Sequence, residues 1–569
     1  MLKECLEVFE KMYKKHWDKL IIDNYNLSEG TYILVKDDES LEVLEVNKNS
    51  ERCSLYDYFV KLDYMSKYLS SNKALADKNI HSNNYLSFFI KKETLLNGKL
   101  TEKIIDGYFD LLKDPLTKYG KKKKSKEIYE KAEKDYGKVN EVKLERSREW
   151  IKNNLNETYI TTNIKDISFE KAYLKNVLKV FFEDSIDEYE KESNKYVLPN
   201  IYNSNDYNIE IEGDVFGLHN NYMGLNAKKP FLEQRTRKNT LPYLIDNNQV
   251  LLQNKLFDYL NTISKERYIY FGDDEIYTQK DLELKDNFDG YFLRVNKGQE
   301  LELLDYDLVI NLRMKLRKAF VVNNFLGTDF SKKKDPIEYN KSFEKLFDIE
   351  SLINDIFFKK FLINNYFSSK NDIKLNDNKL VEILLINRQS LFAYFKKGKM
   401  FPSNFSKFSL EIIKNSIISE NYLRACEQFN LRQSIIEYFE GGRDMGDTLN
   451  NVKNVLREKI NQNETKTIET NEEYYFAIGQ LSNYLLGLSK SGNKNHSAIN
   501  TLINSKTDER LNNELKKLFK KYNYAIQKNS KRFNNLYSMI LAYNPSVKID
   551  DELIIAGYLS SSLIFEKGE

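Results

Sequence analysis

The chain has 569 residues, more than one hydrophobic core normally organises, so roughly two to four domains are expected. Hydrophobic residues make up 41% and aromatic residues 13% of the sequence, which excludes the class of intrinsically disordered chains. The net charge is only +3, with 88 basic and 85 acidic residues, so the chain is no polycation. Any nucleic-acid surface must therefore come from local clusters of charge.

Cysteine usage and hydropathy bear on the cellular compartment. Cys5, Cys53 and Cys426 lie far apart, none has a partner at metal-site spacing, and their odd number argues against a disulfide framework. Charged residues interrupt the first ten positions, and no run of about 18 apolar residues occurs. We therefore expect neither a signal peptide nor a membrane span, and we expect a cytoplasmic protein.

The first part of the chain predicts a mixture of helices and strands. Apolar residues recur at helical spacing from Leu2 to Tyr13 and predict an amphipathic first helix. Residues 31–36 and 41–46 are rich in strand-forming residues and flank a polar turn, which predicts a hairpin. Four further runs bounded by turn formers predict strands, namely residues 209–212, 267–271, 290–295 and 301–304. Strand signals largely stop after about residue 310.

From Asp348 onward, apolar residues follow a period of 3.6, which predicts helices. Two runs alternate apolar residues by four and three, as in a helix that packs in a bundle: Tyr474, Ile478, Leu481, Leu485 and Leu488, and then Leu511, Leu515, Leu518 and Tyr522. Residues 461–471 are polar and predict a loop. We expect an α+β fold, with a mixed α/β amino-terminal part and an all-helical carboxy-terminal bundle. The expected domains are residues 1–340 (α/β), 341–444 (a helical connecting region) and 445–569 (the bundle).

Two basic clusters precede the helical part. Residues 118–126 contain six lysines, among them Lys121, Lys122, Lys123 and Lys124. Such a run is either a solvated flexible loop or a loop that neutralises phosphates. The second cluster consists of Lys228, Lys229, Arg235, Arg237 and Lys238. Because arginine binds phosphate oxygens in a bidentate manner, we interpret this cluster as a nucleic-acid contact.

Asn83 and Asn84 precede a buried-looking run that ends at Lys91 and Lys92. An asparagine amide both donates and accepts hydrogen bonds, so paired asparagines can read base edges, particularly in the minor groove. Asparagine also caps helices, and that structural role is the alternative. We include these four residues among the expected nucleic-acid contacts.

A basic stripe is expected on the carboxy-terminal helices. Residues 490–532 contain eleven basic and three acidic residues, a net charge of +8. On a helix, four lysines fall on the face away from Leu511, Leu515 and Leu518, and a bundle would present them to solvent. These lysines are Lys516, Lys517, Lys520 and Lys521, and Lys531 and Arg532 extend the basic region. An ordinary solvated helix face is the alternative.

Gly272, Asp273 and Asp274 follow a predicted strand and are similar to the aspartate pair of polymerase palms, where two carboxylates hold magnesium. A tight hairpin turn explains the same residues, and no third carboxylate in a matching context is evident. The sequence contains no Walker-type phosphate loop, no zinc-ligand spacing and no nucleophile elbow. We expect no catalytic residues, no metal and no cofactor.

Three stretches together carry a resemblance to a known family: residues 80–92, residues 228–242, and residues 476–480 with 532–543. In this order they resemble the Csh-type large subunit of the type I-B CRISPR Cascade surveillance complex, over most of the chain. The resemblance implies a non-catalytic antiviral-defence subunit that binds the guide RNA handle and target DNA. It also implies recognition of the protospacer-adjacent motif, help in opening the duplex and recruitment of the helicase-nuclease. In such complexes base pairing reads the target sequence, and the protein reads a short motif and the backbone.

The partners implied by this resemblance are the CRISPR guide RNA, target double-stranded DNA, the backbone and other Cascade subunits, and the helicase-nuclease. It further implies a small subunit, which such systems can make from an internal start. We predict this start at Met445, because the codons of Gly441 and Gly442, when spelled GGA-GGN, contain a ribosome-binding sequence a short distance before the Met445 codon. A glycine loop that ends a helix explains the same residues. Two other classes of function remain open: a metal-dependent nucleic-acid or nucleotide-processing enzyme using Asp273 and Asp274, and a scaffold that binds no nucleic acid.

Overall fold

A computed structural model of the chain describes residues 2–66, 75–164, 173–202, 204–219, 244–265, 267–297, 301–441, 445–464, 466–489, 499–527, 530–545 and 548–566. The chain divides into two units, Met1–Gln279 with Gly290–Leu308, and Lys280–Asp289 with Val309–Glu569. Residues 309–340 therefore pack with the second unit, whereas the predicted domain boundaries at residues 340 and 444 stay predictions.

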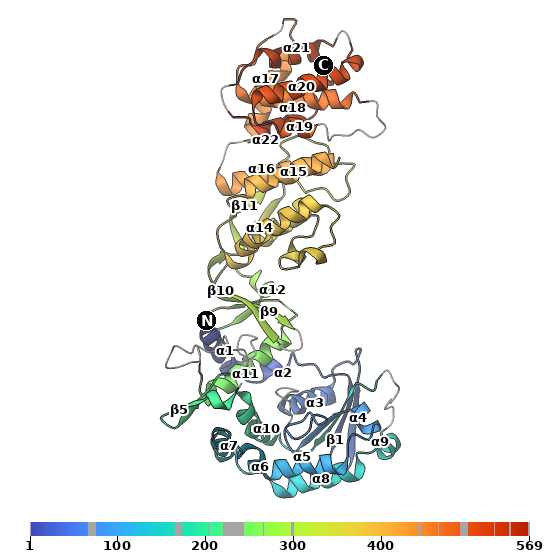
Figure 1. The fold of residues 1–569 in the computed structure, drawn as a ribbon, viewed down its shortest axis with the longest axis vertical. Helices are drawn as coiled ribbons and strands as arrows, with labels where there is room; N and C mark the ends of the chain where they lie inside the picture. Colours follow the sequence, from blue (N-terminus) through green and yellow to red (C-terminus); the bar gives the residue numbers. More distant parts are fainter. Residues whose placement is uncertain are drawn as a thin grey trace. The chain divides into compact units, whose positions relative to one another are not determined.

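The first unit contains a four-stranded sheet with the strand order β2-β1-β4-β3 (Figure 1). Its strands are β1 (Gly30–Val35), β2 (Leu41–Val46), β3 (Ser87–Lys91) and β4 (Val177–Phe182). β1 and β2 form the predicted antiparallel hairpin, and β1 runs parallel to β4. Gly30 begins β1 with a φ of 152°, and a Cβ there would lie 2.1 Å from the carbonyl oxygen of Val177. Glycine is therefore required where β1 meets β4.

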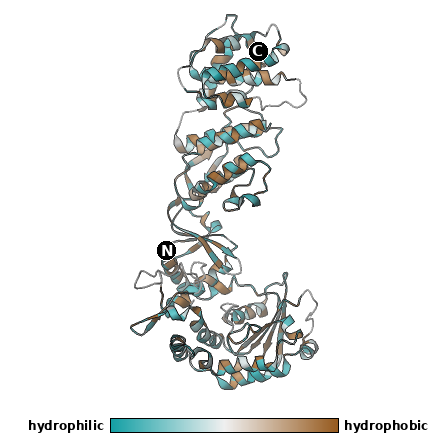
Figure 2. Ribbon diagram, viewed as in Figure 1, coloured by the Kyte–Doolittle hydropathy of each residue, from teal (hydrophilic) through white to brown (hydrophobic). Residues whose placement is uncertain are grey.

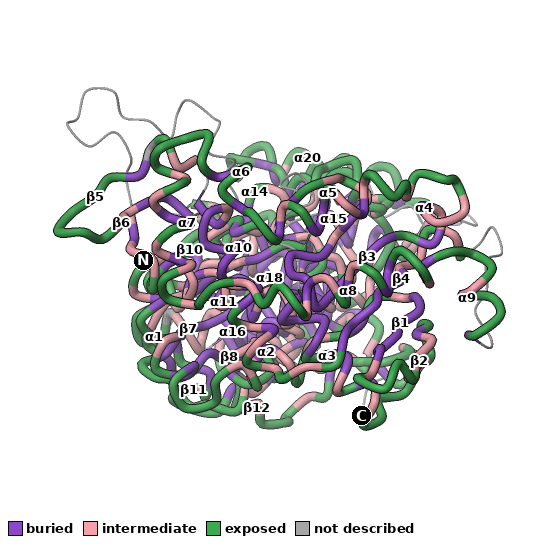
Figure 3. The backbone as a smooth tube through the Cα atoms, turned by 90° about the horizontal axis from the view of Figure 1, so that it is seen from below, coloured by how far each residue is buried: buried purple, intermediate pink, exposed green. Residues whose placement is uncertain are grey.

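Burial along the strands explains their places in the sheet. Every residue of β1 is buried, as is nearly every residue of β4, and Figure 3 shows these stretches in purple. Such continuous burial is typical of central strands covered on both faces. β2 carries Glu42 and Glu45 among leucines and valines and is mostly half-buried, as expected at an edge.

The helices of the first unit begin at polar capping residues. Thr101, Asn140, Asn156 and Ser185 each accept a hydrogen bond from a backbone N–H in the first turn of α5, α8, α9 and α10. Hydrophobic and hydrophilic residues alternate along α5 and α8, which pack against each other (Figure 2). The helices are α1 (Leu2–His16), α2 (Lys19–Ile22), α3 (Ser54–Met65), α4 (Lys92–Leu96), α5 (Glu102–Lys113), α6 (Leu116–Tyr119), α7 (Lys123–Tyr136), α8 (Glu141–Asn154), α9 (Glu157–Asn163), α10 (Ile186–Ile201) and α11 (Asn247–Thr262).

A second four-stranded sheet has the order β10-β9-β7-β8, and its long strands carry residues of both units. The strands are β7 (Tyr268–Phe271), β8 (Ile276–Thr278), β9 (Asn287–Lys297) and β10 (Leu301–Arg313), with α12 (Gln279–Leu282) between β8 and β9. A separate hairpin consists of β5 (Ile209–Ile211) and β6 (Asp214–Phe216). The strands predicted before residue 310 are therefore present.

Strands continue further than the sequence indicated, because β11 (Lys315–Val321) pairs with β12 (Ser342–Lys345). β11 carries three basic residues among its first four positions, which hides the apolar alternation that marks a strand. The prediction that strand signals largely stop after about residue 310 is therefore wrong for β11 and β12.

Helices make up the rest of the second unit: α13 (Leu346–Leu352), α14 (Asn378–Lys397), α15 (Phe405–Ile418), α16 (Tyr422–Glu440), α17 (Met445–Asn461), α18 (Asn471–Gly487), α19 (Asn500–Ile503), α20 (Asp508–Tyr522), α21 (Lys531–Ala542) and α22 (Asp551–Leu559). The predicted loop 461–471 connects α17 and α18. Buried residues occur all around α18, which packs closely on α22. A Cβ on Gly479 would lie 2.1 Å from the Ile554 oxygen, and one on Gly557 would lie 2.1 Å from the Phe476 oxygen. The two helices thus meet backbone to backbone.

The α+β class predicted from the sequence is confirmed, with an amino-terminal α/β region followed by a helical stretch from α14 to α22. Cys5, Cys53 and Cys426 are free thiols. In the described part of the chain, none of the helices combines the length and the apolar character needed to cross a membrane.

Candidate nucleic-acid interface

The outer face of α20 carries the predicted basic stripe. Leu511, Leu515 and Leu518 are buried, whereas the four predicted lysines Lys516, Lys517, Lys520 and Lys521 are exposed. Lys517 forms an ion pair with Glu514, with 2.8 Å between Nζ and Oε1. Lys516 and Lys520 have no acidic partner among the described residues. The helix therefore presents cations to solvent from a rigid, well-packed support.

Lys531 and Arg532, at the start of α21, make structural contacts. The Lys531 Nζ donates to the Asn463 Oδ1 at 2.7 Å, and the Arg532 Nε donates to the Asn461 Oδ1 at 2.7 Å. Arg532 also donates to the backbone oxygen of Glu566. These bonds tie the loop after α17 to α21, so part of the basic character of this region serves the fold.

The lysines of residues 121–124 are all exposed, with Lys121 in a turn, Lys122 in a bend, and Lys123 and Lys124 in the first turn of a helix. α7 begins at Lys123, and Lys122 Nζ lies 2.8 Å from Asp206 Oδ2, a contact that lowers the pKa of Asp206. Lys124 donates to the backbone oxygens of Asp206 and Asn208. Lys123 Nζ lies 3.8 Å from the Glu127 Oε1, one turn further along α7. Three of the four lysines thus have structural partners, and the phosphate contact of this cluster stays a prediction.

Asn83 and Asn84 lie inside the first unit. The Asn83 Nδ2 donates to the Ser193 Oγ at 2.9 Å, and the Asn84 Oδ1 accepts from the Ser87 Oγ at 2.9 Å. An asparagine that reads a base edge needs its amide at the surface, so this geometry favours a structural role. The two side chains form buried hydrogen bonds with other side chains and do not cap a helix.

The neighbouring lysines differ from each other in their exposure. Lys91 is exposed, whereas the Nζ of buried Lys92 lies 3.0 Å from the Glu45 Oε1. Of the two, Lys91 alone is therefore placed to meet a phosphate in this conformation.

The cluster formed by Lys228, Lys229, Arg235, Arg237 and Lys238 lies outside the described residues. Its predicted contact with nucleic acid stays a prediction.

Asp273 and Asp274 form the turn between β7 and β8, which is closed by a 2.9 Å hydrogen bond from the Gly272 N–H to the Glu275 oxygen. The Asp274 carboxylate lies 3.2 Å from Lys11 Nζ and 3.9 Å from Lys15 Nζ. Lysines at these distances compete with a cation for the carboxylate oxygens. Within the described ranges, no group of three or more His, Cys, Asp or Glu side chains is arranged to hold a metal ion. The geometry favours the turn interpretation.

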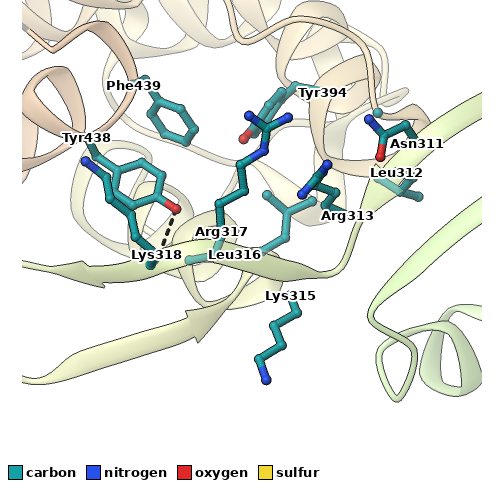
Figure 4. Close-up of a pocket in the computed structure, with 12 residues that line it drawn as sticks. Asn311, Leu312, Arg313, Lys315, Leu316, Arg317, Lys318, Tyr394, Tyr438 and Phe439 are labelled. Atoms are coloured by element: carbon teal, nitrogen blue, oxygen red, sulfur yellow. Dashed lines mark hydrogen bonds between the residues drawn. The ribbon is translucent and has the colours of Figure 1, made fainter.

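Sequence reasoning missed a basic pocket of about 470 Å³ in the second unit. It lies where β10 bends into β11 and where α14 and α16 end. Its walls combine Arg313, Arg317 and Lys318 with the rings of Tyr394, Tyr438 and Phe439, and Figure 4 shows both arginines on the same side of the strand as the rings. The run of basic residues from Arg313 to Lys318 is a local signal that could have indicated the strand side. The rings follow far along the chain, and nothing local connects them to it.

Comparison of this chain with protein-family models, with curated proteins and with solved structures gives no match in any of the three.

Proposed function

We propose that this chain is the non-catalytic large subunit of a type I-B CRISPR Cascade complex and that it binds nucleic acid through its exposed basic surfaces. The observation that supports nucleic-acid binding best is made on α20. Lys516, Lys520 and Lys521 are exposed on one face of this helix, and its opposite face is buried. Cations fixed in this way release condensed counterions when they meet phosphates. Lys520 and Lys521 also lie in the last turn of α20, where cations stabilise a helix, whereas Lys516 lies in the middle of the helix and gains nothing from this effect.

The specific assignment rests on the resemblance of three sequence stretches. On that basis the partners are the guide RNA handle, target duplex DNA with its protospacer-adjacent motif, the other Cascade subunits and the helicase-nuclease, in the cytoplasm. A subunit with a net charge near zero and local basic surfaces suits this work, since base pairing with the guide supplies the sequence specificity.

Charge neutralisation on α20 tests nucleic-acid binding. Replacing Lys516, Lys517, Lys520 and Lys521 by glutamine should weaken binding of the purified chain to duplex DNA in gel shifts at graded salt. The slope of log affinity against log salt should decrease by about one for each lysine that contacts a phosphate. A matched control replaces four exposed lysines elsewhere in the same unit, Lys332, Lys334, Lys370 and Lys379, and should leave the slope unchanged.

Equal slopes for the two variants would remove α20 from the interface, and no binding by the unaltered chain would favour a scaffold. Co-expression with a CRISPR array and the other Cascade subunits tests the specific assignment, because guide RNA should co-purify with this chain. Magnesium-dependent cleavage of the probe that disappears in an Asp273→Ala, Asp274→Ala variant would overturn the non-catalytic part of the proposal.

A further inference from the structure

The pocket beside β11 has a rigid frame. Gly398 ends α14 in the left-handed region with a φ of 65°, and a Cβ there would lie 3.0 Å from the Leu312 Cα. The end of α14 therefore rests directly on the backbone of β10. The Tyr438 hydroxyl of α16 donates to the Lys318 backbone oxygen at 2.9 Å, which fixes the end of α16 on β11. Strand and helix ends are thus held together around one cavity.

The strand side of this pocket is strongly basic. Arg313, Lys315, Arg317 and Lys318 occur within six positions, and the first three are exposed and have no acidic partner among the described residues. The Lys318 ammonium lies 5.0 Å from the centre of the Tyr438 ring. In Figure 4 Arg313 and Arg317 lie on the pocket side of the strand, and Lys315 points away from it. Two guanidinium groups therefore face the cavity, and no carboxylate in the described part of the chain neutralises them.

The helix side of the pocket is an aromatic wall. The Phe439 ring stacks on Phe401, with centres 4.2 Å apart, and stands nearly perpendicular to Tyr394 and Tyr438. Tyr394 in turn packs edge-on against Phe401. Because each ring is braced by another, the wall is preformed, and the protein would lose little side-chain entropy when a flat ligand binds. Burial raises the pKa of the Tyr394 phenol, whose hydroxyl therefore stays protonated and able to donate a hydrogen bond.

Helix polarity decides which part of a ligand goes where. α14 and α16 both end at the pocket, and helix carboxyl ends carry partial negative charge. An anionic group is therefore repelled from the helix side and attracted to Arg313 and Arg317. A flat aromatic group with hydrogen-bond donors fits the helix side, where the partial negative charge can accept those hydrogen bonds. The cavity volume of about 470 Å³ lies within the range usual for small ligands, about 300–1,000 Å³.

We infer that this pocket binds one unpaired nucleotide of a nucleic-acid strand, with its base stacked on Tyr438 beside the nearly perpendicular ring of Phe439 and near Tyr394, and its phosphate on Arg313 and Arg317. The inference rests on the proposed function, and it adds a place where a strand is held by stacking. In a duplex the base faces are covered by neighbouring pairs, so a wall of rings accepts only a base that is unpaired or turned out of the helix.

Binding of a short fluorescent single-stranded oligonucleotide to the full chain, followed by anisotropy, tests the inference. Tyr438→Leu removes a ring and should weaken binding roughly 5- to 150-fold, the range for loss of one stacked base, whereas Tyr438→Phe keeps the ring and should bind almost as well. The double variant Arg313→Gln, Arg317→Gln should weaken binding. It should also reduce the slope of log affinity against log salt by about two. The Lys315 side chain lies on the same strand but points away from the pocket, so Lys315→Gln should weaken binding by much less than half as much, in free energy, as the double arginine variant.

The exposed arginine pair keeps the test decisive even if Tyr438→Leu does not fold. Unchanged binding in both the arginine and the leucine variants, while the α20 lysine variant binds less, would overturn the pocket and leave the proposed function intact. Unchanged binding in all three variants, or no binding by the unaltered chain, would overturn both. Competition by free adenosine monophosphate or by polyglutamate at concentrations equal to the oligonucleotide would contradict a strand as the ligand.

Discussion

Glu192 and Lys195 form an ion pair within the buried face of α10. Glu192 Oε1 lies 2.5 Å from Lys195 Nζ, and both side chains are almost fully buried. The second carboxylate oxygen of Glu192 has no hydrogen-bond partner among the described residues, and neither has the Oδ1 of Asn83. Burial raises the pKa of Glu192 to about 7, although Lys195 acts in the opposite direction.

This raised pKa predicts a dependence of stability on pH. In the folded chain Glu192 keeps its proton up to a higher pH than in the unfolded chain, so the folded chain binds more protons between about pH 4.5 and 7. The contribution of this group to the free energy of unfolding is therefore largest at low pH and should decrease by up to about 3 kcal/mol as the pH rises to 7.

Urea unfolding at a series of pH values between about 5 and 7 measures this contribution. A variant with Glu192→Gln and Lys195→Met removes both charges of the pair, so no buried charge is left unpaired. Its stability should lack this part of the pH dependence. Parallel pH profiles for the two proteins would show that Glu192 titrates at its ordinary pKa.

At the scale of single elements, α18 and α22 depend on two glycines. Because Gly479 and Gly557 each lie against a backbone oxygen of the other helix, any side chain there forces the helices apart. We expect Gly479→Ala to lower the free energy of unfolding by several kcal/mol through overpacking of the core. Gly487→Ala is the matched control on the same helix, since a Cβ there would meet no described atom of another element within 4 Å, and it should be neutral or slightly stabilising. Thermal unfolding of both variants gives the comparison, and equal melting temperatures would contradict the close contact.

Elements that rest on local patterns could be predicted from the sequence. The β1–β2 hairpin follows from two runs around a polar turn, and the two faces of α20 follow from the spacing of Leu511 and Lys516. β11 could not be predicted, because its basic residues hide the alternation. Asn83 was recognised as a hydrogen-bonding residue, but its partner Ser193 is brought close only by the fold. The pocket was missed for the same reason, since Arg317 and Tyr438 line one cavity only after the end of α14 has packed on β10 and α16 has packed on β11.

At the scale of the whole molecule, the helices after Met445 share their core with the helices before it. The apolar cluster that contains α18 and α22 also includes Ile413, Ile417 and Phe429 of α15 and α16. Polar contacts add to this, with 2.6 Å between Arg432 Nη1 and Glu552 Oε1, and 2.8 Å between Lys414 Nζ and Asp551 Oδ2. A product that starts at Met445 would leave these groups without their partners.

We therefore expect a fragment of residues 445–569 to be less stable than a fragment of residues 309–569, or to self-associate through the face that α15 and α16 cover. Thermal unfolding and size-exclusion chromatography of the two fragments measure this difference. A monomeric short fragment of equal stability would show that the shared core is dispensable. Whether cells make the short product is tested separately, by recoding Gly441 and Gly442 synonymously, replacing Met445 by leucine and looking for loss of a small co-purifying band.

The contact between α18 and α22 also matters while the chain is being made. α18 ends at Gly487, and its tightest neighbour begins only at Asp551. At translation rates of about 5–20 residues per second, α18 leaves the ribosome several seconds before the helix that covers it. During this interval its apolar surface is open to chaperones and to other nascent chains. A ribosome that pauses between these two helices prolongs the interval, so codon choice in that stretch of the message influences how much of the protein reaches its folded state.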